Sequence, residues 1–397
     1  MTPPIADEKA EGLHPPKYII NLSLPPGQRY QEVARDFKDR VQELPKLFDD
    51  IVKDLNLPLQ WTKWVAKCLL RRLHNREETQ ELRGISQITG IDLYLLVAFN
   101  VLLDLFMGCT SGGVRTHDSA GESRMLHFRT LDWGMDPLRG IIVQLDYLGR
   151  PNGPIIASSL TYAGYVGVLT GVREGLSISL NFRPCHDGST RLANFRFYFN
   201  HVMILLGFRS SISSLLREYL LPSPSSLHRP SRMSTLESIL HRLPSTVTTA
   251  AYIILCDGDQ TVILEKDHVT AEILSSADFV VATNHDVSEE ANKQSPSAPL
   301  NNQAASLHLT GMEVLVEESI SRKDTICKLW ADVDRSKRGR STRASTRPKN
   351  VQTRDVINWM KTYPINNEET HFATIMDPQK GEFIWTQRYI VAGSESE

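Results

Sequence analysis

Residues 91–111 read IDLYLLVAFNVLLDLFMGCTS, and the pattern of the chain changes at the end of this stretch. Before Cys109, apolar residues recur at helical spacing over 28–57, 61–73, 77–89 and 91–107. After Cys109, short runs of β-forming residues alternate with turns. The sequence therefore predicts an α+β protein in which a mostly helical segment precedes a strand-rich part.

The expected strands are short and follow the usual turn residues. One of them, Tyr18–Leu22, comes before the helices and ends at a Pro-Pro-Gly breaker. Residues 250–266 predict a hairpin, because two apolar runs flank Asp257-Gly258, a pair suited to positive φ. Further strands are expected at 124–128, 141–147, 155–160, 165–170, 176–182, 273–283, 370–376 and 381–389, and helices at 196–206, 212–221 and 236–243.

The composition limits the class of protein. The chain has 397 residues, 41% of them hydrophobic and 23% charged, which is enough apolar surface for a large core and excludes a wholly disordered chain. The net charge of −2 argues against binding of nucleic acid through the overall charge of the protein, so no nucleic-acid partner is expected.

Five widely spaced cysteines, at positions 68, 109, 185, 256 and 327, form no CxxC motif. They indicate neither a zinc ribbon nor a disulfide framework, and they fit a reducing compartment. The first residues, MTPPIADEKA, have no basic start followed by an apolar core. We therefore expect an intracellular, cytoplasmic location.

Three segments fall outside the expected core. Residues 1–16 are polar and predict a flexible tail, and 288–303 and 331–350 predict insertions. The second insertion contains a run of seven basic residues without an acid, at 335–349. Such a run is a solvated loop in the simpler interpretation and a contact to an anionic membrane surface, or a nuclear address, in the sharper one.

Several common catalytic motifs are absent from the sequence: GxxxxGK[ST], HExxH and GxSxG do not occur, and no GxGxxG follows a strand. The twelve histidines are scattered, with no pair at ligand spacing. No metal and no organic cofactor is therefore expected.

Strong polar groups stand in apolar surroundings at four places: GCTS at 108–111, FRTLDWG at 128–134, SLNF at 179–182 and ATNHD at 282–286. Taken singly, Cys109 fits a small core residue, Arg129 and Asp132 an ion pair, and Asn181 and Asn284 turn formers at strand ends.

Taken together, these segments resemble the N-terminal-nucleophile cysteine amidases, and within them the acid ceramidase and N-acylethanolamine-hydrolysing acid amidase family. Bile-salt hydrolases and penicillin V acylase are more distantly similar. The resemblance begins with PPKYIINLSLPPGQRY at 15–30 and continues through CTS at 109–111 and HFRTLDWG at 127–134. AGYVGVLTG at 163–171 is its most specific piece, and TNHD at 283–286 is its last.

The resemblance implies a four-layer αββα N-terminal-nucleophile hydrolase fold with two stacked antiparallel sheets. It also implies self-cleavage between Gly108 and Cys109. Residues 17–108 would then form an α-chain and 109–397 a catalytic β-chain, and the two chains would stay associated.

It further implies a division of catalytic roles. Cys109 is the expected nucleophile, and its freed α-amine, with a reference pKa of about 7.7–8.0, the expected base. Asp132 would hold that amine, and Arg129 would lie beside the thiol. Asn181 and Asn284 would donate to the oxyanion, and the family's remaining arginine corresponds to Arg322.

The implied substrate is an N-acyl lipid, a ceramide or an N-acylethanolamine, with Trp133, Tyr165 and Phe182 as expected substrate contacts. Two departures stand out. Phe182 occupies a position where the ceramidase branch usually has an acid, and Gly112-Gly113 replaces apolar residues. Alternatives therefore stay open: a non-enzymatic lipid- or anion-binding protein on the same scaffold, or an amidase for bile-salt, β-lactam or acyl-homoserine-lactone amides.

Overall fold

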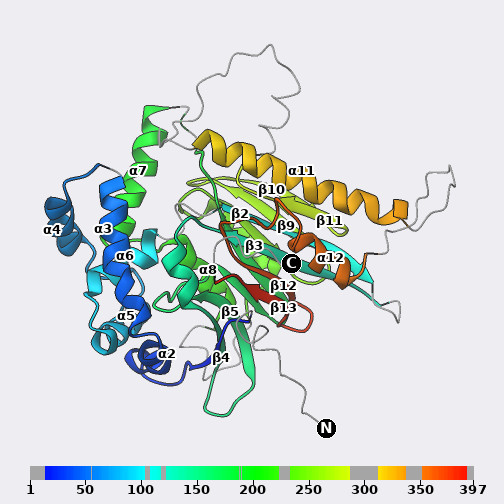
Figure 1. Ribbon diagram of the computed structural model, residues 1–397. Coiled ribbons are helices and arrows are strands. Elements are labelled where there is room, and N and C mark those ends of the chain that lie inside the picture. The colour runs from blue at the N-terminus through cyan, green and yellow to red at the C-terminus, as the bar shows by residue number, and fades with distance from the viewer. Residues whose placement is uncertain are drawn as a thin grey trace, which may run out of the picture.

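The computed structural model describes residues 14–54, 56–102, 108–117, 122–186, 188, 190–222, 233–286, 312–336 and 351–390. Two β-sheets stack face to face, and helices cover both outer faces (Figure 1). This arrangement confirms the predicted α+β class and its four αββα layers. The expected tail lies almost wholly outside the described residues, and the expected insertion at 288–303 lies entirely outside them.

The larger sheet has eight strands in the order β1-β4-β5-β6-β7-β8-β9-β10. Its one parallel pair joins β1 to β4, so the sheet departs from a purely antiparallel one at that edge. The strands are β1 (Lys17–Asn21), β4 (Ile142–Leu148), β5 (Ile155–Tyr162), β6 (Thr170–Arg173), β7 (Leu176–Phe182), β8 (Ala251–Cys256), β9 (Thr261–Lys266) and β10 (Ala271–Ser276).

The smaller sheet has five strands in the order β11-β2-β3-β12-β13, and every neighbouring pair is antiparallel. The strands are β2 (Gly108–His117), β3 (Ser123–Asp132), β11 (Phe279–Ala282), β12 (Thr370–Asp377) and β13 (Glu382–Arg388). Strand β2 begins at the residue before Cys109, so the expected cleavage position lies at the start of a central strand.

The helices before the sheets are α2 (Gln31–Asp36), α3 (Leu44–Asp54), α4 (Leu59–Leu69), α5 (Arg76–Thr89) and α6 (Leu93–Leu102). The single helix expected over 28–57 is wrong, because it begins only at Gln31 and a 3-10 turn at Arg40–Glu43 divides it into α2 and α3. The apolar spacing concealed the break, since Phe37 before the turn and Val41 within it are buried in the same core cluster.

The later helices are α7 (Arg191–Leu205), α8 (Ile212–Leu220), α9 (Leu236–Arg242), α11 (Met312–Ser336) and α12 (Thr353–Met360). Helix α11 was not expected, and it corrects one boundary: residues 331–336, assigned to the second insertion, continue this helix. Residues 337–350 lie outside the described part. In Figure 1, α11 and α12 lie over the small sheet, on the side away from α2–α6.

Three strand predictions need correction. The run 165–170 is not a strand, since only Thr170 belongs to β6, and the run 273–283 is divided between β10 and β11. The Gly-rich β2 was not expected as a strand at all. The hairpin at 250–266 is confirmed as β8 and β9, and Gly258 takes a φ of 98° at its turn.

Apolar side chains concentrate on the outer faces of the sheets. One cluster joins β4, β5 and β7 to the upstream helices and α8, and a second joins β2, β3 and β12 to α11 and α12. A third, small apolar cluster joins β8 and β9 of the large sheet to β11 of the small one, and polar contacts between the sheets lie elsewhere. There His127 on β3 hydrogen-bonds Ser177 and Ser179 on β7, at 2.9 and 2.8 Å.

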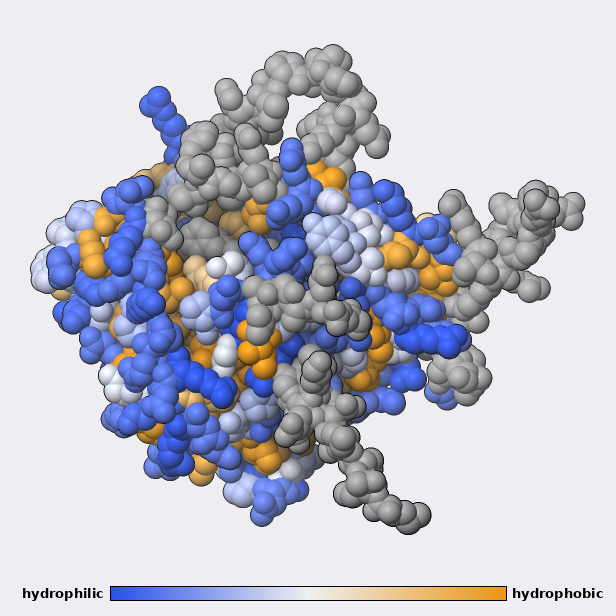
Figure 2. All heavy atoms as spheres, in the orientation of Figure 1, coloured by the Kyte–Doolittle hydropathy of each residue, from blue (hydrophilic) through white to orange (hydrophobic). Residues whose placement is uncertain are grey.

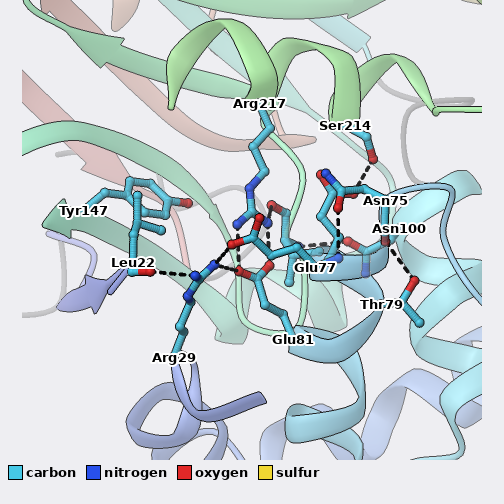
Figure 3. Close-up of polar contacts among 12 residues, drawn as sticks. Leu22, Arg29, Asn75, Glu77, Thr79, Glu81, Asn100, Tyr147, Ser214 and Arg217 are labelled. Carbon is cyan, nitrogen blue, oxygen red and sulfur yellow. Dashed lines mark hydrogen bonds and ion pairs between the residues drawn. The ribbon is translucent and has the colours of Figure 1, made fainter. Parts of the chain in front are cut away.

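A buried polar cluster joins the upstream helices to the strand-rich part (Figure 3). The guanidinium of Arg217 on α8 donates to both carboxylate oxygens of Glu81 on α5, at 2.5 and 2.7 Å. Arg29 donates to the same carboxylate at 3.0 Å and also pairs with Glu77. Since Glu81 is fully buried, its charge depends on these two guanidinium groups.

Two neighbouring side chains extend this cluster. Asn100 on α6 donates to Gly164 O at 2.9 Å and accepts from Val166 N at 2.8 Å. Ser214 donates to Glu78 at 2.6 Å, and burial raises the pKa of Glu78 to about 7. Among the described residues, no helix is long and apolar enough to cross a membrane.

Replacing Arg217 by Met should lower the free energy of unfolding by about 3 kcal/mol, because the buried Glu81 carboxylate loses its bidentate partner. Urea denaturation measures the loss. Lys53→Met is the matched control: it breaks an exposed pair with Asp50 and should change the free energy by less than about 0.5 kcal/mol. Equal effects of the two variants would contradict a stabilising role for the cluster.

Candidate active site

The ladder between β2 and β3 brings the expected nucleophile and its charged partners together. Gly108 lies opposite Asp132, Cys109 opposite Leu131, and Ser111 opposite Arg129. Because successive side chains of a strand point to opposite faces, Arg129 shares the face of Cys109, and Asp132, three residues further on, lies on the other. The side chains opposite one another in these pairs, Gly108 aside, are at most 1% exposed.

The thiol of Cys109 faces the larger sheet. Its sulfur lies 3.9 Å from Leu180 O on β7, and Arg129 Nη2 donates to it at 3.4 Å. Arg129 also donates to Leu180 O at 2.8 Å and to Leu169 O. Burial raises the pKa of the Cys109 thiol, and the neighbouring Arg129 guanidinium opposes that shift. A thiolate at this position would thus have a positive charge beside it.

The backbone nitrogen of Cys109, which belongs to the expected scissile bond, donates to Asn284 Oδ1 at 2.7 Å. Arg322 Nη2 donates to the same oxygen at 2.9 Å, and the Asn284 amide donates to Phe182 O at 2.8 Å. In the uncleaved chain, therefore, this nitrogen contacts Asn284, whereas the sequence assigned its later α-amine to Asp132.

The Asp132 carboxylate lies beside Gly108, which pairs with Asp132 in the ladder between β2 and β3. Arg322 Nη1 pairs with Oδ2, and the Thr370 hydroxyl donates to Oδ1 at 2.8 Å. Burial raises the pKa of Asp132, while Arg322 and the Thr370 hydrogen bond oppose that shift. Arg322 thus connects the two groups that flank the scissile bond, Asp132 and Asn284.

Asn181 on β7 contacts β2 two residues after Cys109, at Ser111. Its Oδ1 accepts from Ser111 at 2.7 Å, and its amide donates to Ala282 O and Thr283 O at 3.2 and 3.4 Å. Asn181 thus ties β7, in the large sheet, to the end of β11, in the small one.

Helix α11 delivers two further side chains to this end of β11. Ser319, one turn before Arg322, accepts from the backbone nitrogen of Asn284 at 2.6 Å and lies 2.8 Å from His285 Nδ1. Because residues three apart share a helix face, one helix positions both the backbone and the side chain of Asn284. The Arg322 guanidinium thus lies between Asn284 and Asp132, and its role stays a prediction.

The two glycines that depart from the family pattern have a steric reason. A Cβ at Gly112 would lie 2.2 Å from Val280 O, and one at Gly113 would lie 1.8 Å from Thr261 Oγ1. Both contacts are too short for real atoms, so here β2 packs against β11 and β9 more closely than side chains permit.

The expected substrate contacts lie on two sides of the site. Trp133 and Tyr165 are buried, and they join an aromatic group with Tyr162 and with Phe99 of α6, whose ring centroids lie 5.8 to 6.4 Å apart. Phe182 is only partly buried and lies at the end of β7, beside Asn284.

Sequence reasoning missed Thr370 and Ser319. The spacing of Ser319 and Arg322 would have suggested a shared helix face had α11 been recognised, but Thr370 is joined to Asp132 only by strand pairing. No group of three or more His, Cys, Asp or Glu side chains with the arrangement of a metal site occurs in the described part of the chain.

Iodoacetamide should alkylate Cys109 at least about tenfold more slowly than the exposed Cys68, because Cys109 is buried and its pKa is raised. Mass spectrometry of the peptide that retains the Gly108–Cys109 bond reports only on uncleaved molecules. In urea the two rates should converge. Equal rates in the folded protein would contradict this description of the thiol.

Comparison with known proteins gives matches to the same group of amidases that the sequence motifs resemble. The family model of the beta subunit of N-acylethanolamine-hydrolyzing acid amidase matches residues 14–74. N-acylethanolamine-hydrolyzing acid amidase of Caenorhabditis elegans is 37% identical over 180 residues, which are 43% of this chain and 48% of that protein. Human acid ceramidase is 30% identical over 192 residues, 44% of this chain and 47% of that protein.

A solved structure of the Caenorhabditis elegans amidase ortholog aligns over 68% of this chain and 93% of its own, with 22% identity and a TM-score of 0.44. The chain spans about half the length of the curated relatives it matches. In sequence, the chain is thus similar to the N-acylethanolamine-hydrolyzing acid amidases and acid ceramidases.

Proposed function

We propose that this protein is a self-processing cysteine amidase that hydrolyses the amide bond of N-acyl lipids, of the ceramide or N-acylethanolamine type, to a fatty acid and an amine. The observation that carries the proposal is the environment of Cys109. Its thiol contacts Arg129, and its own backbone nitrogen contacts Asn284. A nucleophile and a future base thus belong to one residue.

In the self-cleavage step, the Cys109 sulfur adds to the carbonyl carbon of Gly108. The carbon–nitrogen bond breaks, and the nitrogen leaves with the thiol proton as the α-amine of Cys109. Water then hydrolyses the thioester, giving the carboxylate of Gly108 and a free thiol. Asn284 and Arg322 support this step, because they hold the leaving nitrogen and its acceptor.

In the hydrolysis of a substrate, the α-amine takes the proton of the thiol, and the thiolate attacks the acyl carbon. The amine product leaves with that proton, and water hydrolyses the acyl thioester to the fatty acid. Arg129 stabilises the thiolate, and Asp132 orients the α-amine. The amides of Asn284 and Asn181 are the proposed donors to the oxyanion, and in the uncleaved chain both donate to backbone carbonyls.

The acyl chain would lie against the buried aromatic group beside the site. Phe99 belongs to α6, the last helix before the cleavage position, and its ring contacts Tyr162 and Tyr165. Once residue 108 is a free end, movement of α6 would open this apolar region to a lipid chain. The buried Arg217–Glu81 pair would keep the two products of cleavage together.

Cys109→Ala should abolish both self-cleavage and lipid hydrolysis, because it removes the nucleophile. Intact mass and N-terminal sequencing measure cleavage, and release of palmitate from N-palmitoylethanolamine and from palmitoyl ceramide measures hydrolysis. The wild type should yield a fragment that begins at Cys109. Cys68→Ala, at an exposed thiol, is the matched control and should behave as the wild type.

A wild type that stays whole at neutral and mildly acidic pH would contradict the catalytic assignment, because the base would never form. In that case, binding of the intact chain to the same lipids would support the non-enzymatic alternative, which Phe182 in place of an acid favours. Cleavage without hydrolysis of either lipid would direct the search to other linear amides.

We also propose that the protein takes its substrate from a lipid surface. Trp61 and Trp64 on α4 are 62% and 65% exposed, and Phe195 on α7 is 64% exposed. Both helices pack against α6, which precedes the site. Figure 2 shows hydrophobic surface among hydrophilic residues where α4 lies. Exposed tryptophans favour the interface of a bilayer.

Trp61→Ser combined with Trp64→Ser should weaken binding to phosphatidylcholine vesicles at least about tenfold, because two large apolar side chains no longer enter the bilayer. Vesicle co-sedimentation measures it. Ile155→Ser is the control, since Ile155 is 55% exposed at the start of β5. Equal loss in both variants, or none in the double variant, would contradict docking through α4.

A further inference from the structure

The Asp132 carboxylate has a direct hydrogen-bond partner on strand β12. That strand pairs with β3 so that Thr370 lies directly opposite Asp132. The register shifts after Thr370, and Phe372 then pairs with Leu131. The irregularity turns the first residue of β12 toward the site, where its hydroxyl is fully buried.

The contacts of the Thr370 hydroxyl fix the direction of its proton. Its oxygen accepts from the backbone nitrogen of Asn367 at 2.9 Å. The one proton of the hydroxyl is then directed to Asp132 Oδ1, at 2.8 Å. Such a bond favours the ionised form of the carboxylate.

The backbone around Thr370 is held as firmly as its side chain. The guanidinium of Arg139, which is 1% exposed, donates to the carbonyl oxygens of Glu368 and Thr370. Trp133 N, directly after Asp132, donates to Glu369 O at 2.7 Å. These backbone contacts therefore fix the position of the Thr370 hydroxyl relative to the Asp132 carboxylate.

We infer that Thr370 is a positioning residue of the proposed amidase: its hydroxyl fixes the Asp132 carboxylate in its charged form, in the orientation that receives the α-amine of Cys109. The inference rests on the proposed function for its catalytic meaning. With Oδ1 held by Thr370 and Oδ2 by Arg322, the carboxylate plane is fixed on the side of the Gly108–Cys109 bond.

Other groups act on the same carboxylate and are the same in every variant below. Arg322 reaches it from α11 and Arg129 from β3, and both favour its charge. Cys109 faces it from β2, Glu369 from the turn before β12, Tyr162 from β5 and Tyr389 from the end of β13. A change of one hydroxyl is therefore measured against a constant electrostatic background.

The test compares Thr370→Val, which keeps the shape but removes the hydroxyl, with Thr370→Ser, which keeps the hydroxyl. Thr374→Val is the matched control, because Thr374 is a buried threonine of the same strand that bonds Trp385 O and Thr386 instead. The first readout is the rate at which the cleaved protein releases palmitate from N-palmitoylethanolamine, measured against pH. The second is the titration of the Asp132 carboxyl carbon by NMR of the carbon-13-labelled full chain, assigned with Asp132→Asn.

In Thr370→Val, the pKa of Asp132 should rise by about one unit, because a hydrogen bond to the charged form is lost. Since the reaction needs the carboxylate, the rate should fall off about one pH unit higher on the acid side and be about tenfold lower at its plateau. Thr370→Ser should restore both within about twofold, and Thr374→Val should move neither.

An unchanged carboxyl titration in Thr370→Val would overturn the inference, even if that variant is less stable, because loss of the Asn367 contact alone explains lower stability. The same titration separates the two proposals. If the wild type neither cleaves nor hydrolyses, the proposed function fails, and the carboxyl titration still decides what Thr370 does to Asp132.

Discussion

The site depends on the burial of two guanidinium groups and one carboxylate around the start of β2. Arg129, Asp132 and Arg322 are each at most 2% exposed, where an uncompensated charge is costly. Asp132 and Arg322 compensate each other, but Arg129 donates to two carbonyl oxygens and to the neutral thiol. The protein therefore holds a buried positive charge that a thiolate at Cys109 would neutralise. Both sheets are required for this, since Arg129 comes from the small sheet and its partner Leu180 O from the large one.

The same two layers connect the site to the upstream helices. Asn100 of α6 hydrogen-bonds the backbone at Gly164 and Val166, and Arg217 of α8 donates to Val166 O. This loop leads directly to Leu169, whose carbonyl accepts from Arg129. Hydrogen bonds to both ends of this buried loop thus connect the helix before the cleavage position to the guanidinium beside the thiol. The most specific family motif of the sequence, 163–171, is this loop and the start of β6.

Local sequence patterns predicted the features that depend only on residues close together in the chain. The spacing of Arg129 and Asp132 on a strand and the hairpin at Asp257-Gly258 needed only near neighbours in the chain. Asn284 and Arg322 were found through resemblance, and the structure places both beside Cys109. The features that the sequence did not predict depend on contacts between strands that are far apart in the chain. Strand β2 has glycines where a strand usually has β-branched residues, because close packing against β11 and β9 excludes a Cβ. Thr370 comes to Asp132 only through the register of β12 on β3.

The position of strand β1 affects how the protein would unfold and refold after cleavage. It lies at residues 17–21, far upstream of Cys109, yet it forms the parallel edge of the large sheet beside β4. If the Gly108–Cys109 bond is cut, one polypeptide supplies a strand to the sheet of another. Unfolding then changes from a unimolecular to a dissociative process, and the apparent Tm becomes dependent on protein concentration. The native pairing is made while the ends are still covalently joined, so a denatured mature protein would have to find its partner by diffusion. Its persistence would then be governed by kinetics more than by equilibrium.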